Sequence, residues 1–445
     1  MKDFTVGKPL KEIFFFSLPI LMGSAFQQLY NVVDSMVVGK FIGTEALAAV
    51  GASFPLTFLV VSLFIGIGTG FTVVVSQYFG AKKFAEIKRT LDTLILSTIA
   101  MTLILSVLGV ISAKWILRWI GLEENIIPDA TIYLQIYFGG IFFQFLFAGV
   151  NAVIRGLGDS KTPMNFLIIS TALNVILDIL FVVVFKWGVS GVGIATILAQ
   201  IISLGVMLIV LNKKYPQFFD FSIRKFIFDK IIFKQAIKVG LPTGLQVGFV
   251  ALGSIMIFLI VSPFGTNAIA AYSVVMRLDS FATLPVMNLA TALSTFVGQN
   301  VGAGKYERVK MGLMDTLKIS LAFSIVLSLT LIFLSDFLMT LFTDDAEVIQ
   351  IGARSLHIIA PFYIIFAGMF TLQGCLRGVG AVMIPMFCTL ISLWLVRIPL
   401  AWYLGKILAL EGVWWSTPGS WFMGALLMGI YFASGHWKKV KVINN

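Results

Sequence analysis

The chain has 445 residues, of which 59% are hydrophobic and 12% are charged, and its mean hydropathy is +0.99. Soluble domains carry about 45–50% apolar and about 25% charged residues, so this composition excludes a soluble globular protein and indicates a polytopic membrane protein. The two cysteines, Cys375 and Cys388, lie in apolar surroundings, which excludes a disulfide framework or a CxxC metal site. The formal net charge of +11 raises nucleic-acid binding as an alternative until the basic residues are located along the chain.

The first apolar run is not expected to be a cleavable signal peptide. It contains Pro19, lacks a small-x-small cleavage site and continues into a polar helix face. An apolar helix of roughly 20 residues crosses the hydrocarbon core. The lengths of the apolar runs therefore predict twelve membrane-spanning helices, called spans below. Their ranges are 12–38, 47–79, 91–113, 130–154, 163–186, 191–212, 235–262, 268–300, 312–335, 350–376, 383–405 and 412–434.

The distribution of Lys and Arg predicts the orientation of these spans. Of the 32 basic residues, 23 lie in the two termini or in the connections after spans 2, 4, 6, 8 and 10 and the adjoining span ends, whereas six lie in the opposite loops and the span ends beside them. Both termini are therefore expected in the cytoplasm. The positive charge is then a topology signal, and we expect no nucleic-acid partner.

The two halves of the chain repeat at an offset of 222 or 223 residues. Leu18-Pro19 returns as Leu241-Pro242, and "SQYFGAKKFAEIK" from Ser76 answers "GQNVGAGKYERVK" from Gly298. "RGLGDSKTP" from residue 155 likewise answers "RGVGAVMIP" from residue 377. With six spans each, the repeats run in the same direction, which implies a pseudo-twofold axis along the membrane normal. We therefore predict an all-α fold with two six-helix lobes, an N-lobe (1–211) and a C-lobe (231–445), joined by a basic cytoplasmic linker (212–230).

Several polar residues within the N-lobe spans recur at helical spacing, so each set shares one helix face. Gln27, Asn31 and Asp34 line the first span, Asn174 and Asp178 the fifth, and Thr196 and Gln200 the sixth. Lipid cannot satisfy such groups, so we expect them to face the lobe interior. There they could stabilise helix packing through interhelical hydrogen bonds, at ~0.6–2 kcal/mol each. However, a carboxylate within the membrane is costly, and amides would form such hydrogen bonds without that cost. This favours a functional role for the two acids.

Asp34 and Asp178 with neutral oxygen donors could hold Na⁺, because hard cations prefer carboxylate, amide and hydroxyl oxygens. The Na⁺ ligands would be Asp34, Asp178 and Asn174. The same pair could bind H⁺ instead, because like charge and a low dielectric constant favour protonation. The choice between the two ions stays open.

The repeat, the doubled Gln-x-x-Gly-Ala-x-Lys loop and "RGLGDSKTP" make the chain resemble the multidrug and toxic compound extrusion (MATE) transporters over nearly its whole length. "ALNVILDILFVVVFKWGVSGVGIATILAQ" from residue 172 adds the signature of the fifth and sixth spans. The resemblance implies an antiporter that exports amphipathic, often cationic compounds in exchange for H⁺ or Na⁺. Matching the family's N-lobe cation site residue by residue gives Asp34, Asn151, Asn174, Asp178 and Thr196.

The C-lobe departs from this pattern. At the repeat offset, Asp34 falls on Met256 or Ile257, and Asp178 falls on Leu400. The seventh span, which is acidic in some members of the family, offers only Gln246 here, so the chain looks closer to the DinF-like and MepA-like branch. Gln246 and Asp279 remain as secondary polar groups on the substrate path. For Asp279 we favour a structural or mouth-lining role, with contact to a cationic substrate as the alternative. For Arg397 we favour a snorkelling or interhelical role over ligand binding.

We therefore expect a multidrug antiporter that works by alternating access, as a monomer in the plasma membrane, with no cofactor besides its coupling cation. The alternative is a lipid-linked oligosaccharide flippase of the related superfamily. Such flippases usually line their cavity with several Arg or Lys residues, whereas only Arg277, Lys318 and Arg397 lie inside a span here and more than five residues from its end. A membrane enzyme is not expected, because no Asp-rich pair, His cluster or Ser/His/Asp set is present.

Overall fold

A computed structural model describes residues 1–219 and 226–443 of the chain. Within these ranges, the side chains at positions 31, 35, 44, 45, 47, 52 and 55 lie outside the description. The described residues form helices and short connections, with no β-strand.

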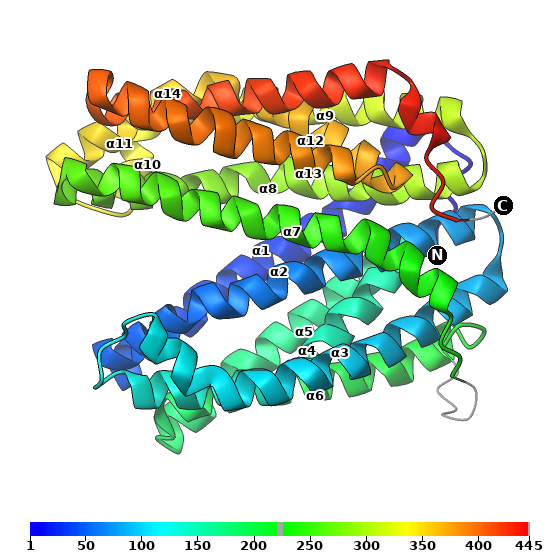
Figure 1. Ribbon diagram of the computed structural model, residues 1–445, viewed down its shortest axis with the longest axis horizontal. Coiled ribbons are helices and arrows are strands. Elements are labelled where there is room, and N and C mark those ends of the chain that lie inside the picture. The colour runs from blue at the N-terminus through cyan, green and yellow to red at the C-terminus, as the bar shows by residue number, and fades with distance from the viewer. Residues whose placement is uncertain (220–225, 444–445) are drawn as a thin grey trace. The chain divides into compact units, whose positions relative to one another are not determined.

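The first half of the chain forms six long helices (Figure 1), two of which continue into a π-helical segment. The elements are α1 (Pro9–Val37), the π segment η1 (Val38–Ile42), α2 (Thr44–Gly80), α3 (Phe84–Trp119), α4 (Ile127–Gly156), α5 (Lys161–Asp178), the π segment η2 (Ile179–Val184) and α6 (Gly188–Lys214).

The second half repeats this series with more interruptions. Its elements are α7 (Lys230–Val261), η4 (Ser262–Phe264), α8 (Thr266–Gly302), α9 (Tyr306–Phe333), α10 (Ser335–Thr340), α11 (Ala346–Ile359), η5 (Ala360–Phe362), α12 (Tyr363–Val379), α13 (Met383–Leu390), the π segment η6 (Ile391–Arg397), α14 (Ile398–Ala433) and η7 (His436–Lys439).

Eleven helical runs among the described residues are long and apolar enough to cross a membrane. The last of them, Met383–Ala433, has 51 residues, about twice what one crossing needs. Ala409 interrupts it with a non-helical φ of 51° and ψ of −140°, between the predicted spans 383–405 and 412–434. Counting the two sides separately gives twelve crossings, which confirms the predicted all-α fold.

By its internal contacts the chain divides into two compact units. We call them the N-unit (Met1–Lys2 and Met22–Gly240) and the C-unit (Asp3–Leu21 and Leu241–Asn445). The divisions fall within α1 and α7, after the second residue beyond Pro19 and one residue before Pro242. The expected lobe boundaries at 211 and 231 stay a prediction.

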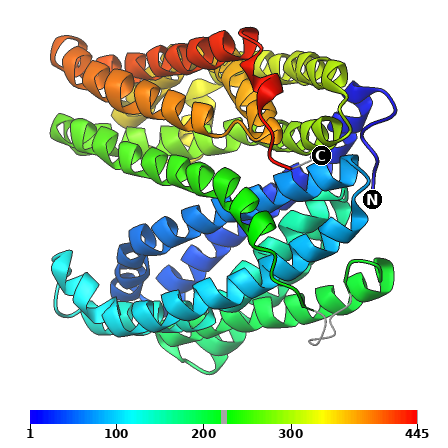
Figure 2. The ribbon, with the colours of Figure 1, turned by 45° about the vertical axis from the view of Figure 1, so that its right-hand side comes forward.

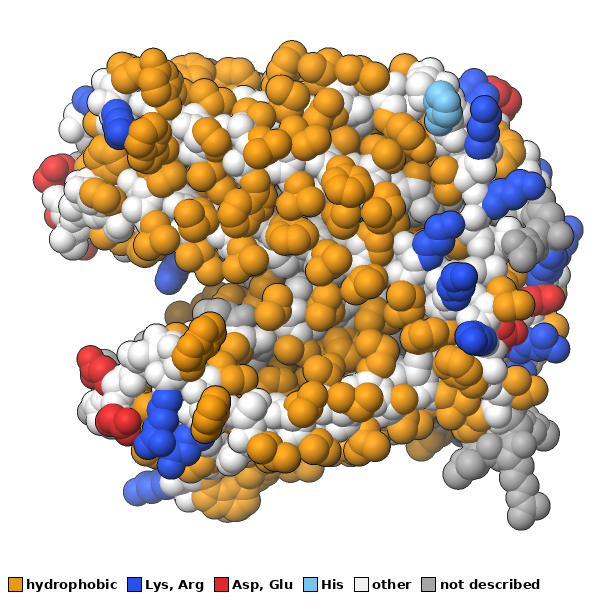
Figure 3. All heavy atoms as spheres, viewed as in Figure 1, with side chains coloured by type: hydrophobic (Ala, Val, Ile, Leu, Met, Phe, Trp, Pro, Cys, Tyr) orange, Lys and Arg blue, Asp and Glu red, His pale blue; other side chains and the backbone are white. Residues whose placement is uncertain are grey.

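One helix lies at the centre of each unit, and the two central helices occupy matching positions of the repeat. In the N-unit, α4 packs against α2, α3 and α6. In the C-unit, α12 packs against α8, α9 and α14 (Figures 1 and 2). Outer helix faces carry mostly apolar side chains, whereas charged side chains gather toward helix ends (Figure 3), as expected of helices in contact with lipid.

The repeated motifs have a backbone explanation. Gly43 and Gly265, related by the offset of 222, precede α2 and α8 with φ of 123° and 98°. Gly158 and Gly380 are related in the same way, with φ of 78° and 94°. These angles are strained for residues with a Cβ, so both halves keep glycine where the chain turns between helices.

Candidate cation site

The two N-lobe acids stand where α-helices change into π segments. Asp178 is the last residue of α5, directly before η2, and Asp34 lies four residues before η1. The segments η1 and η2 pack against each other, and both contact α6. This packing brings the ends of α1 and α5 together, and π segments recur at functional sites in proteins.

The carboxyl groups of Asp34 and Asp178 lie within hydrogen-bonding reach of each other. The Asp178 side chain is 0% exposed. One oxygen of each acid, Oδ1, is buried and has no hydrogen-bond partner among the described residues. The N-unit therefore holds two acids in contact, each with an unsatisfied oxygen.

Asn174 and Thr196 complete one side of this pair. When the Asn174 amide is oriented to satisfy both of its ends, its nitrogen donates to Asp178 Oδ2 at 3.0 Å and its oxygen accepts from the Thr196 N–H at 3.3 Å. In the opposite orientation the nitrogen donates to Thr196 Oγ1 at 3.3 Å and the oxygen faces Asp178. The Thr196 hydroxyl donates to the Val192 carbonyl at 3.1 Å and lies 3.5 Å from the Tyr30 hydroxyl.

A cavity of about 90 Å³ lies within the N-unit, with room for a few water molecules. Its lining residues come from α1, α4 and α6: Tyr30, Tyr133, Tyr137, Gly140, Gln144, Gly193, Thr196, Ile197 and Gln200. The phenol groups of Tyr30 and Tyr133 interact electrostatically with both acids. A polar cavity therefore adjoins the carboxyl pair.

Two glycines allow α4 and α6 to approach closely beside this cavity. A Cβ at Gly140 would lie 2.2 Å from Ile197 Cδ1, and a Cβ at Gly193 would lie 2.9 Å from Ile136 Cγ2. Small residues at such crossings let membrane helices pack backbone to backbone.

The sequence analysis missed the tyrosines and Gln144. Tyr133, Tyr137, Gly140 and Gln144 follow one another at intervals of four, three and four residues along α4, which places them on one helix face. That spacing could have identified them. The buried hydroxyl of Tyr137 lies near Gln144. It makes no well-formed hydrogen bond within the described ranges, so it adds an unsatisfied polar group to the cavity.

The other expected N-lobe residues differ in burial and surroundings. Gln200 lines the cavity, and Gln27 is half-buried on α1. Asn151 is 6% exposed, and its Oδ1 has no partner among the described residues. It lies two turns beyond Gln144 on the same face of α4, and no described hydrogen bond joins it to the acids. The Asn31 side chain lies outside the described residues.

The two expected C-lobe residues have partners within the C-unit. Gln246 on α7 donates to Thr389 Oγ1 at 2.6 Å and to the Pro385 carbonyl at 3.3 Å, which joins α7 to α13. Asp279 on α8 accepts a hydrogen bond from the Tyr363 hydroxyl of α12. Asp279 is thus bound to a phenol, and Gln246 to a neighbouring helix, within the C-unit.

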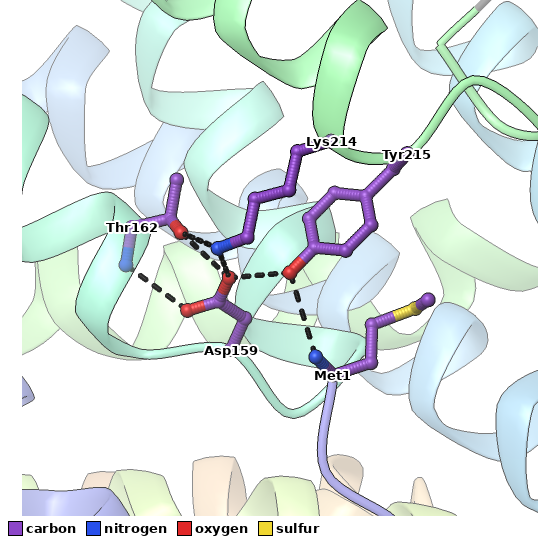
Figure 4. Close-up of polar contacts among 5 residues, drawn as sticks. All are labelled: Met1, Asp159, Thr162, Lys214 and Tyr215. Carbon is purple, nitrogen blue, oxygen red and sulfur yellow. Dashed lines mark hydrogen bonds and ion pairs between the residues drawn. The ribbon is translucent and has the colours of Figure 1, made fainter.

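A second buried acid of the N-unit, Asp159, has a structural environment (Figure 4). Asp159 Oδ2 accepts hydrogen bonds from Lys214 Nζ at 2.8 Å, from Tyr215 at 2.6 Å and from the Thr162 hydroxyl at 2.6 Å. Burial alone would raise the pKa of Asp159, but these hydrogen bonds outweigh it and hold the pKa below its usual range. This network ties the start of α5 to the end of α6.

Within residues 1–219 and 226–443, no group of three or more His, Cys, Asp and Glu side chains could hold a metal ion. The donors around Asp34 are instead two carboxylates, an amide and a hydroxyl, which suit a proton or Na⁺ rather than a transition metal.

The profile of the MatE family matches the chain twice, over residues 19–180 and 242–403. The two matches are offset by 223 residues, which confirms the internal repeat. The chain is 32% identical over 435 residues to the probable multidrug resistance protein YoeA of Bacillus subtilis, covering 96% of this chain and 94% of that protein. It is 27% identical to the probable multidrug resistance protein NorM of Thermotoga maritima, covering 97% and 94%.

Among solved structures, the fold matches a multidrug resistance MATE family transporter of the MOP superfamily in its outward-facing conformation. The TM-score is 0.92 at 21% identity, covering 99% of each chain. The fold and the paired profile match define a multi-pass membrane transporter. The chain belongs to the MatE family, the multidrug and toxic compound extrusion transporters.

Proposed function

We propose that this chain is a secondary active antiporter that exports amphipathic or cationic compounds in exchange for H⁺ or Na⁺, by alternating access. One observation carries the proposal: Asp34 and Asp178 lie in contact within a membrane lobe, and each has a buried oxygen without a hydrogen-bond partner among the described residues. The names of the relatives YoeA and NorM as probable multidrug resistance proteins support a drug as the exported compound.

The pair is suited to an exchangeable cation because two ionised carboxylates in contact repel each other. A proton or a small cation between them relieves the repulsion and satisfies the free oxygens. The orientation of the Asn174 amide would differ between the two ions. A proton is compatible with the Asn174 nitrogen donating to Asp178, whereas Na⁺ held by Asp34, Asp178 and Asn174 requires the amide oxygen to turn toward the acids.

In the cycle we propose, the ion and the drug favour opposite conformations. An ion entering from outside occupies the acids, changes the packing of α1 at Pro19 and at η1, and lowers the affinity for drug. A ligand shifts a conformational equilibrium only through its different affinities for the two states. A membrane potential of about 100 mV contributes ~2.3 kcal/mol for each charge that moves inward.

The remaining expectations belong to the same proposal: a monomer in the plasma membrane with both termini in the cytoplasm, no catalytic activity and no cofactor. A flippase for lipid-linked oligosaccharides is less well supported. Such a protein needs several basic side chains for a pyrophosphate, whereas Arg277, Lys318 and Arg397 are the only basic residues that lie inside a predicted span and more than five residues from its end.

The test is transport in inverted vesicles that contain the full chain. Efflux of a fluorescent organic cation is followed while a pH gradient or a Na⁺ gradient is imposed separately, and the effective gradient identifies the ion. Asp34→Asn and Asp178→Asn should each abolish gradient-driven efflux, whereas Asp129→Asn, an exposed acid in the first turn of α4, should leave it unchanged. Gradient-driven efflux that persists in both site variants would end the proposal.

A further inference from the structure

The doubled Gln-x-x-Gly-Ala-x-Lys loop plays no part in the candidate cation site, but its second copy binds another part of the C-unit. This copy runs from Gln299 on α8 to Lys305, directly before α9. Gln299 Oε1 accepts a hydrogen bond from the Phe4 N–H at 2.9 Å, and Lys305 Nζ donates to the Thr5 carbonyl at 2.9 Å. The loop therefore binds the N-terminal segment, residues 4–7, which precedes α1.

Two further side chains complete this binding site. We call it the clamp, and its residues are Gln299, Asn300, Lys305 and Arg308. Arg308 Nη2 donates to the carbonyls of Phe4 and Val6 at 3.0 and 2.9 Å, and Nη1 donates to the Gly7 carbonyl at 3.0 Å. Asn300 Nδ2 donates to the Phe4 carbonyl at 3.1 Å, and its Oδ1 accepts from Arg308 Nε at 3.1 Å. Every carbonyl of the segment thus accepts a hydrogen bond from the clamp, and those from charged donors are the stronger ones.

Phe4 fixes the segment in the apolar core of the C-unit. Its side chain is 0% exposed, with its ring centroid 4.9 Å from that of Phe16 on α1 and 6.0 Å from that of Phe296 on α8. Val6, by contrast, is 57% exposed. The segment therefore binds as a docked peptide does, with its backbone hydrogen-bonded and one aromatic side chain buried in a pocket.

The N-unit holds the start of α7 in a comparable way beside the first copy of the loop, residues 77–83. Tyr78 of this copy donates to Gln235 Oε1 on α7 at 2.9 Å. Thr93 Oγ1 on α3 accepts from the N–H of Asp229, the residue before α7, at 3.0 Å. Each unit therefore holds the start of the first helix of the opposite repeat, and the C-unit does so through the motif itself.

The clamp holds the start of the helix that carries Asp34. α1 is a single helix of 29 residues, whose residues up to Leu21 belong to the C-unit and whose later residues, with Asp34, belong to the N-unit. A rigid helix carries a structural change from one end to the other, provided that its far end is held.

We propose that the clamp is a peptide-binding site for residues 4–7 that anchors the start of α1, so that ion binding at Asp34 changes the conformation of the C-unit through α1. The inference rests on the proposed function, because it explains how an ion bound in one unit affects the other. When the segment is released, the N-unit still binds its ion, but ion binding no longer drives export.

The first measurement tests the clamp by maleimide labelling of one introduced cysteine in the full-length chain, whose two natural cysteines are buried. Thr5 is 9% exposed, so Thr5→Cys should react slowly. Adding Arg308→Gln should speed the reaction about tenfold, because the hydrogen bonds from a charged donor are lost. The matched control is Lys310→Gln, an exposed lysine paired with Glu307, which should leave the rate unchanged. Val6→Cys should react fast in every background. Equal labelling of Thr5→Cys with and without Arg308→Gln would overturn the clamp.

The second measurement tests the anchor. Arg308→Gln should bind the coupling ion with the affinity of its parent, whereas gradient-driven efflux in inverted vesicles should fall about tenfold, the usual size of coupling between two sites. Phe4→Ala should behave in the same way, and Lys310→Gln should change neither quantity. The anchoring role is overturned by parental efflux in a variant whose Thr5→Cys form labels fast.

Thermal unfolding checks that each variant is folded, and Phe4→Ala provides both measurements if Arg308→Gln fails to fold. Failure of the proposed function has a different signature. No gradient would then drive efflux in the unsubstituted chain, while the difference in Thr5→Cys labelling would persist.

Discussion

The ion affinity of the N-unit pair should depend strongly on the charge of Asp178. Asp178→Asn keeps the size of the side chain and removes one negative charge at a residue that is 0% exposed. Two unit charges about 4 Å apart interact by ~4 kcal/mol at an effective dielectric constant of about 20. For Na⁺ the variant loses the attraction between Asp178 and the ion. For H⁺ it loses the repulsion that protonation of one acid would relieve, and either interaction has about this size.

Because ~1.4 kcal/mol corresponds to a tenfold change in affinity, the substitution should weaken ion binding about a thousandfold. The loss is smaller if one acid is already protonated before the ion arrives. The assay is isothermal titration of the coupling ion into the purified chain, with thermal unfolding as the check on folding. Asp129→Asn is the control and should keep full affinity. An Asp178→Asn protein that is folded and binds the ion as tightly as its parent would refute the electrostatic reasoning.

Three further substitutions test packing and buried hydrogen bonds, each by thermal or denaturant unfolding in detergent. Gly140→Ala should cost ~1–3 kcal/mol because its new methyl group overlaps α6, whereas Gly139→Ala, with nothing within 4 Å of the added Cβ, should cost far less. Tyr363→Phe should cost ~1–3 kcal/mol, because the partly buried Asp279 loses its hydrogen-bond donor. Asp159→Asn should remove part of the pH dependence of the free energy of unfolding. The lowered pKa of Asp159 adds stability above its unfolded pKa of about 3.9, and this stability is lost as the pH falls below that value.

Each of these expectations has a result that contradicts it. Equal costs for the two glycine substitutions would mean that α4 and α6 separate easily. An unchanged stability in Tyr363→Phe would mean that water or another group replaces the phenol. Stability can be compared between about pH 5 and about pH 3, a range that brackets the unfolded pKa of Asp. Parallel stability curves for the parent and Asp159→Asn would show that the Asp159 network does not cause the loss of stability at low pH.

The amino-acid sequence determined the twelve crossings, the internal repeat and the family, because all three depend on local properties. Span length follows from the thickness of the bilayer, and the repeat is visible in residues such as Leu18-Pro19 and Leu241-Pro242. The sequence also singled out Asp34 and Asp178, since an acid within an apolar span is conspicuous wherever that span packs.

The tertiary structure decided which polar groups meet. Spacing along one helix cannot show that η1 packs on η2 and thereby joins Asp34 to Asp178. It also cannot show that Tyr30 on α1 shares a cavity with residues of α4 and α6, or that Gln246 donates a hydrogen bond to Thr389 of α13. Nor can it show that Tyr363 donates a hydrogen bond to Asp279, because 84 residues separate them in sequence. These relations depend on how helices pack against one another, and close packing is set by complementary surfaces such as Gly140 against Ile197, which belong to pairs of helices rather than to either one.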